Sequence, residues 1–298
     1  MMDLTGFEHY LREQGLAMHT VRGYVRDVAA FVRWFEQTNG EPFALPSVTP
    51  TDLREWRGYL QHRLKAATVN RKMAALVRYL RWARAQGQIA EDPSVGLTWT
   101  LPRLERRPRW LDKRERYALL RTLEQDVQTA RLRYPKRWVQ HVRNALLTRF
   151  LLHTGLRVSE ALALRWGDVA LRERSGWVLV REGKGRLQAE VPLNAEARKA
   201  LREWLEVQGQ GTPEAGGRVW PITARTYQRY LERTRRRAGL ERLTPHTLRH
   251  TFGRMLVEQG VPLQTVSRLM RHRNVQTTML YIMPGERDLE RAVEALAG

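Results

Sequence analysis

The helical spacing of apolar residues stops between Thr98 and Leu111 and resumes beyond them. Pro102 and Pro108 stand in this gap, and a helix does not continue through them because proline lacks the backbone N–H that helical hydrogen bonding needs. The gap is also rich in arginine, which makes it a basic, semi-extended connector. We therefore predict a helical domain at residues 1–100, a basic linker at 101–110 and a second domain at 111–298.

The first hundred residues predict a small all-helical domain. Apolar residues from Val21 to Phe35 recur at helical spacing, while arginines occupy other faces of the same segment. A second helix is predicted to begin at Thr68, a candidate N-cap, and to end before Gly87, because glycine readily adopts the left-handed backbone of a helix stop. Weaker helical patterns occupy residues 6–14 and 52–64.

The second domain contains a segment of a different kind. Residues 177–180 are apolar, and residues 187–191 alternate between apolar and polar, as they do in a strand with one buried face. The sequence Gly-Lys-Gly at residues 183–185 would form the turn of this β-hairpin. With helices on both sides, the predicted fold class is mainly α with a small β-sheet or hairpin in the C-terminal domain, a two-domain α+β arrangement.

The charge of the chain constrains its partners. Its 298 residues include 52 Lys and Arg against 31 Asp and Glu, a formal net charge of +21, which favours a polyanion and above all nucleic acid. A membrane surface is less favoured because the basic residues are spread over the chain. No apolar run approaches the length of a membrane span, so we expect a soluble, cytoplasmic protein. The absence of cysteine excludes disulfides, thiolate nucleophiles and cysteine-based zinc sites.

A first candidate catalytic group lies in the segment HTGLRVSEALAL, residues 153–164. Gly155 can end one helix, and the next helix would place Arg157 and Glu160 on the same face. The carboxylate would then orient the guanidinium. Taken alone, such a pair is more simply an ordinary ion pair on a helix surface.

Lys184 lies between two glycines at the predicted hairpin tip. The freedom of the flanking backbone would let this lysine approach a ligand closely, and its ammonium group could protonate a leaving oxygen. In isolation, a lysine at a turn is more often only a solvated surface residue.

Thr244 and Pro245 predict a helix start, as N-cap and first helical residue. His246, Arg249 and His250 then fall in the first turns, with residues 246 and 249 on one face. The two histidines have the i, i+4 spacing of some zinc sites. However, no glutamate follows the first histidine, and Arg249 would place a cation beside the metal, so we predict no metal here.

His272 precedes Tyr281 by nine positions in the segment HRNVQTTMLY. Asn274 can cap a short helix that presents the tyrosine about two turns later. Together with the cationic residues above, this pair could surround one phosphodiester with positive charge and a nucleophile, and so break a DNA strand through a phosphotyrosine. Without the flanking pattern, Tyr281 is more simply a buried structural residue.

These motifs together resemble the tyrosine recombinase, or phage integrase, family, in particular its bacterial Xer-like members. The segments TGLRVSEAL, GKG, HTLRH and HRNVQTTMLY carry the resemblance in the C-terminal part. Arg271 is a departure, because family members often have glycine immediately before the motif histidine. The N-terminal part is similar to the family's helical core-binding domain in a helix that contains Thr20, Tyr24, Asp27, Phe31 and Trp34.

The resemblance implies a role for each candidate residue. Tyr281 would attack a backbone phosphate and form a 3′-phosphotyrosyl bond, with His246 as its base. Lys184 would protonate the departing 5′ oxygen, and no metal, ATP or other cofactor would be needed. The remaining residues would stabilise charge on the phosphate or support those that do, namely Arg157, Arg249, His272, Glu160 and His250.

The resemblance also implies double-stranded DNA as the partner. The two domains would clamp the duplex, and four protomers would assemble on two sites, alone or with a partner recombinase, in a nucleoid-associated protein. The predicted DNA contacts are basic residues of the helical domain, the linker and the nucleophile motif, namely Arg71, Lys72, Arg103, Arg106, Arg107 and Arg271.

Two other functions are open to such a chain. A type IB topoisomerase would use similar chemistry to relax supercoils, but the recombinase-like N-terminal domain disfavours it. The other is a DNA-binding protein that has lost catalysis, which the presence of all six candidate catalytic residues disfavours.

Overall fold

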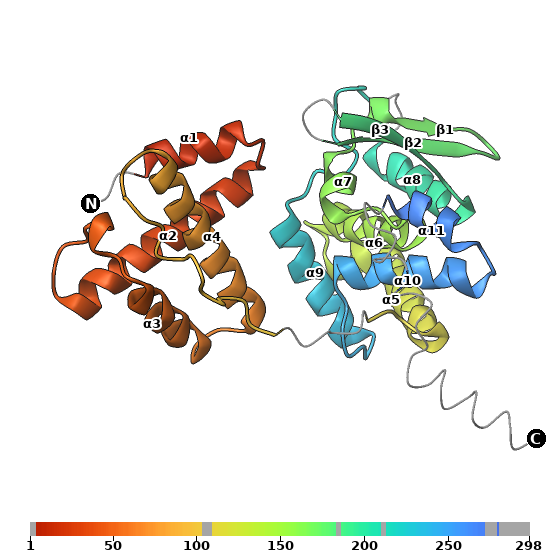
Figure 1. The fold of residues 1–298 in the computed structure, drawn as a ribbon. Helices are drawn as coiled ribbons and strands as arrows, with labels where there is room; N and C mark the ends of the chain where they lie inside the picture. Colours follow the sequence, from red (N-terminus) through yellow and green to blue (C-terminus); the bar gives the residue numbers. More distant parts are fainter. Residues whose placement is uncertain (1–3, 103–108, 183–185, 210–212, 272–278, 280–298) are drawn as a thin grey trace, which may run out of the picture. The chain divides into compact units, whose positions relative to one another are not determined.

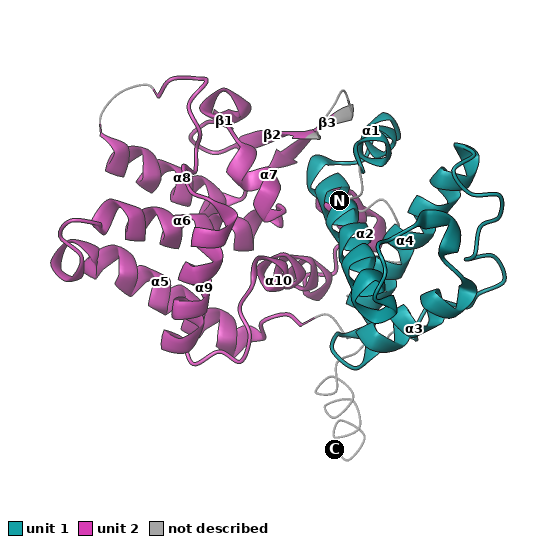
Figure 2. Ribbon diagram, turned by 90° about the vertical axis from the view of Figure 1, so that its left-hand side faces the viewer, with its two compact units in different colours: residues 1–106 teal, residues 107–298 magenta. Residues whose placement is uncertain are grey.

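The structure, a computed structural model, describes residues 4–102, 109–182, 186–209, 213–271 and 279. The chain divides into two compact units, Met1–Arg106 and Arg107–Gly298, which are described separately (Figure 2). The described residues are mostly helical, with one small antiparallel sheet in the second unit (Figure 1). The predicted fold class is therefore confirmed. Arg103, Arg106 and Arg107 lie outside the described residues.

The first unit is a helical domain with an aromatic core. Helix α2 packs against α1, α3 and α4, and the rings of Phe31 and Trp56 meet edge to face with centroids 5.8 Å apart. The predicted helix from Val21 to Phe35 is confirmed as part of α2. The helices are α1 (Thr5–Glu13), α2 (Met18–Asn39), α3 (Pro50–Gln61) and α4 (Ala66–Ala85), with the 3-10 turn η1 (Leu45–Ser47) before α3.

The predicted start of α4 is wrong, and its predicted end is confirmed. The helix begins at Ala66 after the N-cap Lys65, which provides no side-chain hydrogen bond. Thr68 lies inside the first turn, where its backbone N–H donates to the Lys65 carbonyl at 2.8 Å. Alanine at positions 66 and 67 is a strong helix former, so the helix extends beyond the candidate cap. Gly87 follows the helix with φ of 68°.

The second unit is built around α6 (Trp138–Thr154). Helices α5, α8 and α10 all pack against α6, so most of its faces are buried, including the polar side chains of Asn144 and Thr148. The other elements are α5 (Lys113–Arg133), α7 (Val158–Ala163), α8 (Ala195–Gln208), α9 (Ala224–Arg237), α10 (Pro245–Glu258), α11 (Leu263–Met270) and the 3-10 turn η2 (Trp166–Asp168).

The sheet of the second unit has the strand order β1-β2-β3, and both pairs are antiparallel. Strands β2 (Gly176–Glu182) and β3 (Arg186–Pro192) form the predicted hairpin, in which the buried Val178 and Val191 face each other. The sequence does not predict β1 (Val169–Leu171), because three residues are too few to show an alternation.

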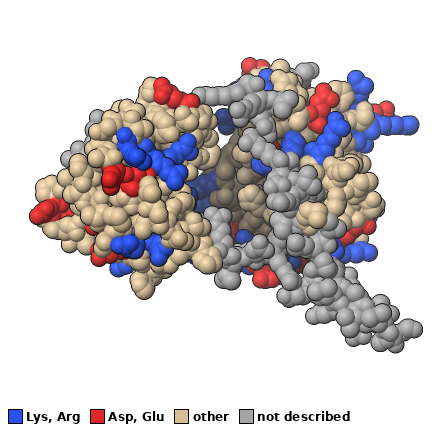
Figure 3. Space-filling view, viewed as in Figure 1, with Lys and Arg blue, Asp and Glu red and all other residues tan. Residues whose placement is uncertain are grey.

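Charged side chains are distributed over the surface of both units. Figure 3 shows Lys and Arg in several small groups on the visible face of each unit, interspersed with acidic side chains. On this face, the basic residues are thus spread in space as well as along the sequence. Within the described ranges, no helix is both long enough and apolar enough to cross a membrane.

Candidate active site

The loop after α6 begins with a glycine that the geometry requires. Gly155 has φ of 62°, in the left-handed region that other residues avoid. A Cβ at this position would also clash with the ring of Phe252 on α10. The predicted helix end at Gly155 is confirmed, and the loop can lie directly against α10 because this residue has no side chain.

Arg157 and Glu160 form the ion pair that their spacing predicts. Arg157 is the N-cap of α7, and its backbone N–H donates to Glu160 Oε2 at 2.7 Å. Its guanidinium Nη1 donates to Glu160 Oε1 at 2.6 Å. The carboxylate therefore fixes both the backbone and the side chain of Arg157. The Arg157 side chain remains 37% exposed, so its guanidinium is accessible from solvent.

Helix α10 starts where the sequence predicts. The Thr244 hydroxyl accepts a hydrogen bond from the Thr247 N–H at 3.1 Å, and Pro245 occupies the first helical position. In the next turns His246 is exposed and His250 is partly buried, with their ring centroids 6.4 Å apart. His246 is therefore the more accessible of the two imidazoles.

His250 has an unusual protonation equilibrium. Burial, together with smaller electrostatic contributions from His246, Arg249 and Arg242, lowers the pKa of His250 to about 4. The imidazole of His250 is therefore neutral at physiological pH. A neutral ring adjoining Arg249 fits a supporting role better than that of a charged group at the phosphate.

Arg249 connects two distant parts of the chain. It is 5% exposed, its Nη1 donates to the Gly155 carbonyl at 2.6 Å, and its Nη2 donates to the Met270 carbonyl. These carbonyls lie at the C-terminal ends of α6 and α11, where helices leave acceptors without intrahelical partners. The Arg249 charge therefore stabilises both helix ends as well as the site.

Arg271 joins the same group of residues. It is the C-cap of α11, and its guanidinium Nη2 donates to Glu160 Oε2 at 2.7 Å. Its own carbonyl accepts a hydrogen bond from Arg157 Nη2 at 3.3 Å. The Arg271 side chain is only 9% exposed, so its guanidinium lies within the cluster and not on the open surface that its predicted DNA contact needs.

Glu160 is held ionised by these arginines. Burial alone would raise the pKa of the Glu160 carboxyl, but the charge of Arg271 and the hydrogen bonds from Arg157 outweigh that effect and lower the pKa. A carboxylate with charged donors on both oxygens has a fixed orientation. The described cluster thus consists of Arg157, Glu160, Arg249 and Arg271.

The remaining predicted catalytic residues are Lys184, His272 and Tyr281, and they lie outside the described residues. In the sequence, His272 follows Arg271 directly and Tyr281 comes nine positions after His272.

Two predicted DNA contacts of the first unit have a partner inside the protein. Lys72 Nζ lies 3.0 Å from Asp27 Oδ1, and Arg71 pairs with the same carboxylate. Asp27 is buried on α2, whereas Arg71 and Lys72 are on α4, so the three charges hold the two helices together. The Arg71 side chain is still partly exposed, and contact with DNA remains a prediction for it.

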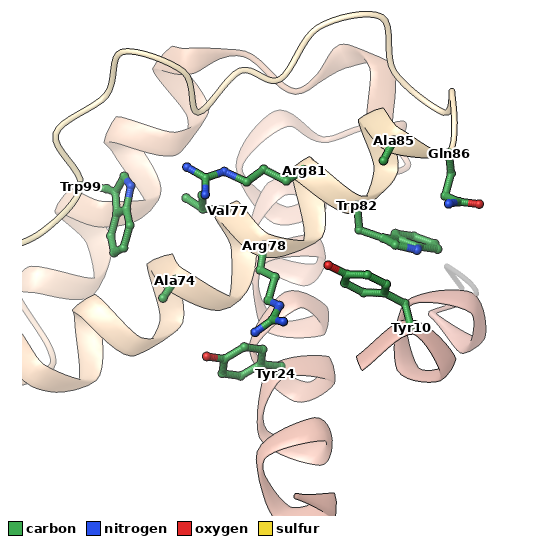
Figure 4. A pocket seen from close by; sticks show the side chains of 10 residues that line it. All are labelled: Tyr10, Tyr24, Ala74, Val77, Arg78, Arg81, Trp82, Ala85, Gln86 and Trp99. Atoms are coloured by element: carbon green, nitrogen blue, oxygen red, sulfur yellow. The ribbon is translucent and has the colours of Figure 1, made fainter. Parts of the chain in front are cut away.

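The first unit also contains a pocket that the sequence does not predict. Its cavity volume is 470 Å³, and Figure 4 shows Arg78 and Arg81 extending from α4 among aromatic rings. The Arg78 guanidinium lies 5.9 Å from the centroid of the Tyr10 ring. Arginines with aromatic rings suit nucleic acid, because the former bind phosphates and the latter stack on bases or sugars. The other aromatic lining residues are Tyr24, Trp82 and Trp99.

Comparison with known proteins agrees with the predicted family. Residues 110–286 match the phage integrase family, and residues 4–87 match the phage integrase N-terminal SAM-like domain. Tyrosine recombinase XerC of Xylella fastidiosa strain 9a5c is 33% identical over 288 residues, which cover 94% of this chain and 90% of the relative.

Solved structures share the fold. XerH site-specific recombinase bound to difH substrate, in a pre-cleavage complex, has a TM-score of 0.69 at 23% identity and covers 92% of this chain and 78% of its own. The Tn1549 transposon integrase, in complex with circular intermediate DNA, has a TM-score of 0.68 at 20% identity and covers 99% of both chains. The chain therefore belongs to the phage integrase family, that of the tyrosine recombinases, and is an enzyme of this class.

Proposed function

We propose that the protein is a site-specific recombinase that cleaves and rejoins duplex DNA through a 3′-phosphotyrosyl intermediate at Tyr281. The observation that carries this proposal is the convergence of Arg157 and Arg249, which come from separate segments and both donate to carbonyls at the end of α11. The nucleophile motif begins in the sequence directly after that helix end. Fixed cations next to a nucleophile are what phosphoryl transfer requires.

In the cleavage step, the Tyr281 hydroxyl oxygen forms a bond to phosphorus and the bond from phosphorus to the 5′ oxygen breaks. A tyrosine hydroxyl has a pKa of about 10, so it needs a base at neutral pH. We assign this role to His246, whose exposed ring on α10 can accept the proton. Lys184 donates a proton to the 5′ oxygen, which leaves as a hydroxyl.

The arginines and His272 stabilise the negative charge that develops on the nonbridging oxygens. Arg157 is suited to this task because its planar guanidinium can donate to two oxygens at once and Glu160 already orients it. Arg249 contributes a positive charge that two backbone carbonyls hold in place. Such charges stabilise the transition state without having to reorganise during the reaction.

The second step reverses the first with a different DNA strand. The phosphotyrosyl ester keeps the energy of the broken phosphodiester, so a 5′-hydroxyl from a partner strand can attack it and release Tyr281. The covalent bonds broken and formed are equivalent in the two steps. Rejoining therefore needs neither ATP nor a metal ion.

The substrate in this proposal is double-stranded DNA, clamped by the two units. Support comes from the net charge of +21 and from the pocket with Arg78 and Arg81, which we assign to phosphate and base contacts of the first unit. Of the two solved structures described above, XerH was bound to difH substrate and the Tn1549 integrase was in complex with circular intermediate DNA. Strand exchange would require four protomers on two sites, of this chain alone or with a partner recombinase, acting at the nucleoid.

A nicked suicide substrate tests the proposal. A DNA site selected by its binding to the protein is nicked close to the cleavage position, so that the short fragment carrying the released 5′-hydroxyl diffuses away and the covalent intermediate accumulates. Wild type and the control Tyr117→Phe, which changes an exposed tyrosine on α5, should form a 3′ adduct, and Tyr281→Phe should form none.

Other outcomes of this experiment favour other functions. An equal adduct from Tyr281→Phe would overturn the nucleophile assignment. Supercoil relaxation without site preference would favour a topoisomerase, and tight binding without any adduct would favour a DNA-binding protein.

A further inference from the structure

Arg271 combines a strained backbone with a buried charged side chain. Its φ of 52° makes it the one non-glycine residue with positive φ among the described residues. Arginine is disfavoured in this region because its Cβ crowds the following carbonyl oxygen. The side chain is also 9% exposed, although burying an arginine is costly unless it is paired. Such strain persists where the surroundings and the contacts that it permits outweigh its cost.

Both the side chain and the main chain of Arg271 act on Arg157. The Arg271 guanidinium donates to Glu160 Oε2, and Glu160 Oε1 accepts from Arg157 Nη1 at 2.6 Å. The Arg271 carbonyl, in its left-handed backbone, accepts from Arg157 Nη2 at 3.3 Å. Arg157, Glu160 and Arg271 thus form a closed ring of contacts, and a change at Arg271 alters two of the groups that orient Arg157.

The Arg271 guanidinium is unsuited to contact DNA directly. Besides Nη2 on Glu160, its Nη1 donates to the Leu269 carbonyl at 3.0 Å. Reaching a phosphate would break both contacts and leave the Glu160 carboxylate partly buried with Arg157 as its remaining partner in the ring.

We propose that Arg271 is a positioning residue, which holds Glu160 and thereby fixes Arg157 in the orientation that receives the phosphate during cleavage. This refinement rests on the proposed function. It predicts an effect on the rate of the chemical step with little effect on DNA affinity, because Arg271 acts through Arg157 and not on the DNA.

Arg271→Asn and Arg271→Lys separate the side chain from the backbone conformation. Asparagine tolerates a left-handed backbone better than most residues but is too short to reach Glu160. Lysine restores one positive charge without the fork of the guanidinium. Arg268→Asn, at an exposed position on the last turn of α11, serves as the matched control.

The experiment measures the single-turnover rate of adduct formation at saturating suicide DNA, and separately the Kd for the same DNA. We expect Arg271→Asn to lower the rate by roughly 10- to 100-fold, as misplacement of a catalytic group does, while the Kd changes by less than about twofold. Arg271→Lys should recover part of the rate, and Arg268→Asn should retain the wild-type rate. In Glu160→Gln with Arg271→Asn, the two losses should not multiply, because both residues act through Arg157.

The outcomes distinguish this inference from the proposed function. A wild-type rate for Arg271→Asn at saturating DNA would overturn the positioning role, and so would a weaker Kd with an unchanged rate, which would indicate a DNA contact. If Arg271→Asn and Arg271→Lys lost the same share of the adduct-formation rate and both had a lowered unfolding temperature, the role of Arg271 would be purely structural. A wild-type protein that forms no adduct would instead refute the proposed function.

Discussion

At the scale of single residues, the site depends on buried charges that are paired. Arg249 is held by backbone carbonyls, and Glu160 lies between two guanidinium groups. His250 differs, because burial among positive charges keeps its imidazole neutral. Each of these groups would be costly to bury without its partner or in its other protonation state.

The lowered pKa of His250 predicts a loss of stability in acid. Its pKa is about 4 in the folded protein against an ordinary 6.5, so below pH 6.5 the unfolded chain binds the proton more readily. The contribution of the neutral ring is complete above pH 6.5 and decreases as the pH falls toward 4. In urea unfolding, the free energy of unfolding of the second unit should therefore fall more steeply for wild type than for His250→Gln.

His19→Gln is the control for this measurement, because His19 is exposed on α2 in the other unit. The control should retain the wild-type dependence on pH. Identical slopes for His250→Gln and wild type across the same pH range would show that the burial of His250 does not contribute to acid stability.

At the scale of elements, helix ends build the site. The C-terminus of α6, the N-terminus of α7 and the C-terminus of α11 meet around Arg249 and Arg157. The close approach of α10 to the loop after α6 depends on Gly155, which lies against Phe252. The Gly155 backbone therefore takes part in two contacts, because it lies against Phe252 and its carbonyl accepts from Arg249.

Gly155→Ala should destabilise the second unit and slow cleavage. A left-handed alanine costs about 1–2 kcal/mol, and the clash with Phe252 adds roughly 1–3 kcal/mol of overpacking. Gly15→Ala is the control, since Gly15 has φ of 71° but a Cβ there would meet nothing within 4 Å. Urea unfolding should show a loss of only about 1–2 kcal/mol for this control. Equal losses in the two variants would contradict the account of the α6–α10 contact.

The parts of the site that the sequence predicts are local. The N-cap of α10 at Thr244 and the pairing of Arg157 with Glu160 each follow from residues three positions apart. The N-cap of a helix is also predicted from local residues. Its position is ambiguous, however, where strong helix formers precede the candidate N-cap, as Ala66 and Ala67 precede Thr68. Strand β1 has too few residues to show a pattern.

The parts that the sequence does not predict are tertiary. Arg271 and Glu160 are 111 positions apart, and Arg249 and Gly155 are 94 apart, so neither contact can be inferred from spacing. The same holds for the pairing of Asp27 with Arg71 and Lys72, two residues for which the family resemblance implies contact with DNA. Charged residues are ambiguous in sequence because a buried partner and a polyanion attract the same side chains.

At the scale of the whole molecule, both units are net positive, but the charge of +21 is unevenly divided, with +4 on residues 1–106 and +17 on residues 107–298. A distributed charge favours contact with a long polyanion over binding of one small anion. Each phosphate contact releases counterions, so the affinity for DNA should depend strongly on salt.

The salt dependence provides a test for the pocket of the first unit. The logarithm of DNA affinity should fall linearly with the logarithm of salt concentration, with a slope of about −0.9 per phosphate contact. Arg81→Ala, in the pocket, should reduce the size of this slope by about one contact. Arg12→Ala, an exposed arginine paired with Glu8 on α1, should leave it unchanged. An unchanged slope for Arg81→Ala would exclude the pocket from the DNA interface.

The central claim is that Tyr281 becomes covalently linked to the 3′ phosphate of cleaved DNA. Its most direct test is mass spectrometry of the purified adduct after digestion with trypsin and nuclease. Trypsin cuts after Arg273 and Arg287, so the nucleotide should be recovered on the peptide of residues 274–287, attached to Tyr281. A nucleotide attached to any other residue, or no adduct on a site that the protein binds tightly, would contradict the claim.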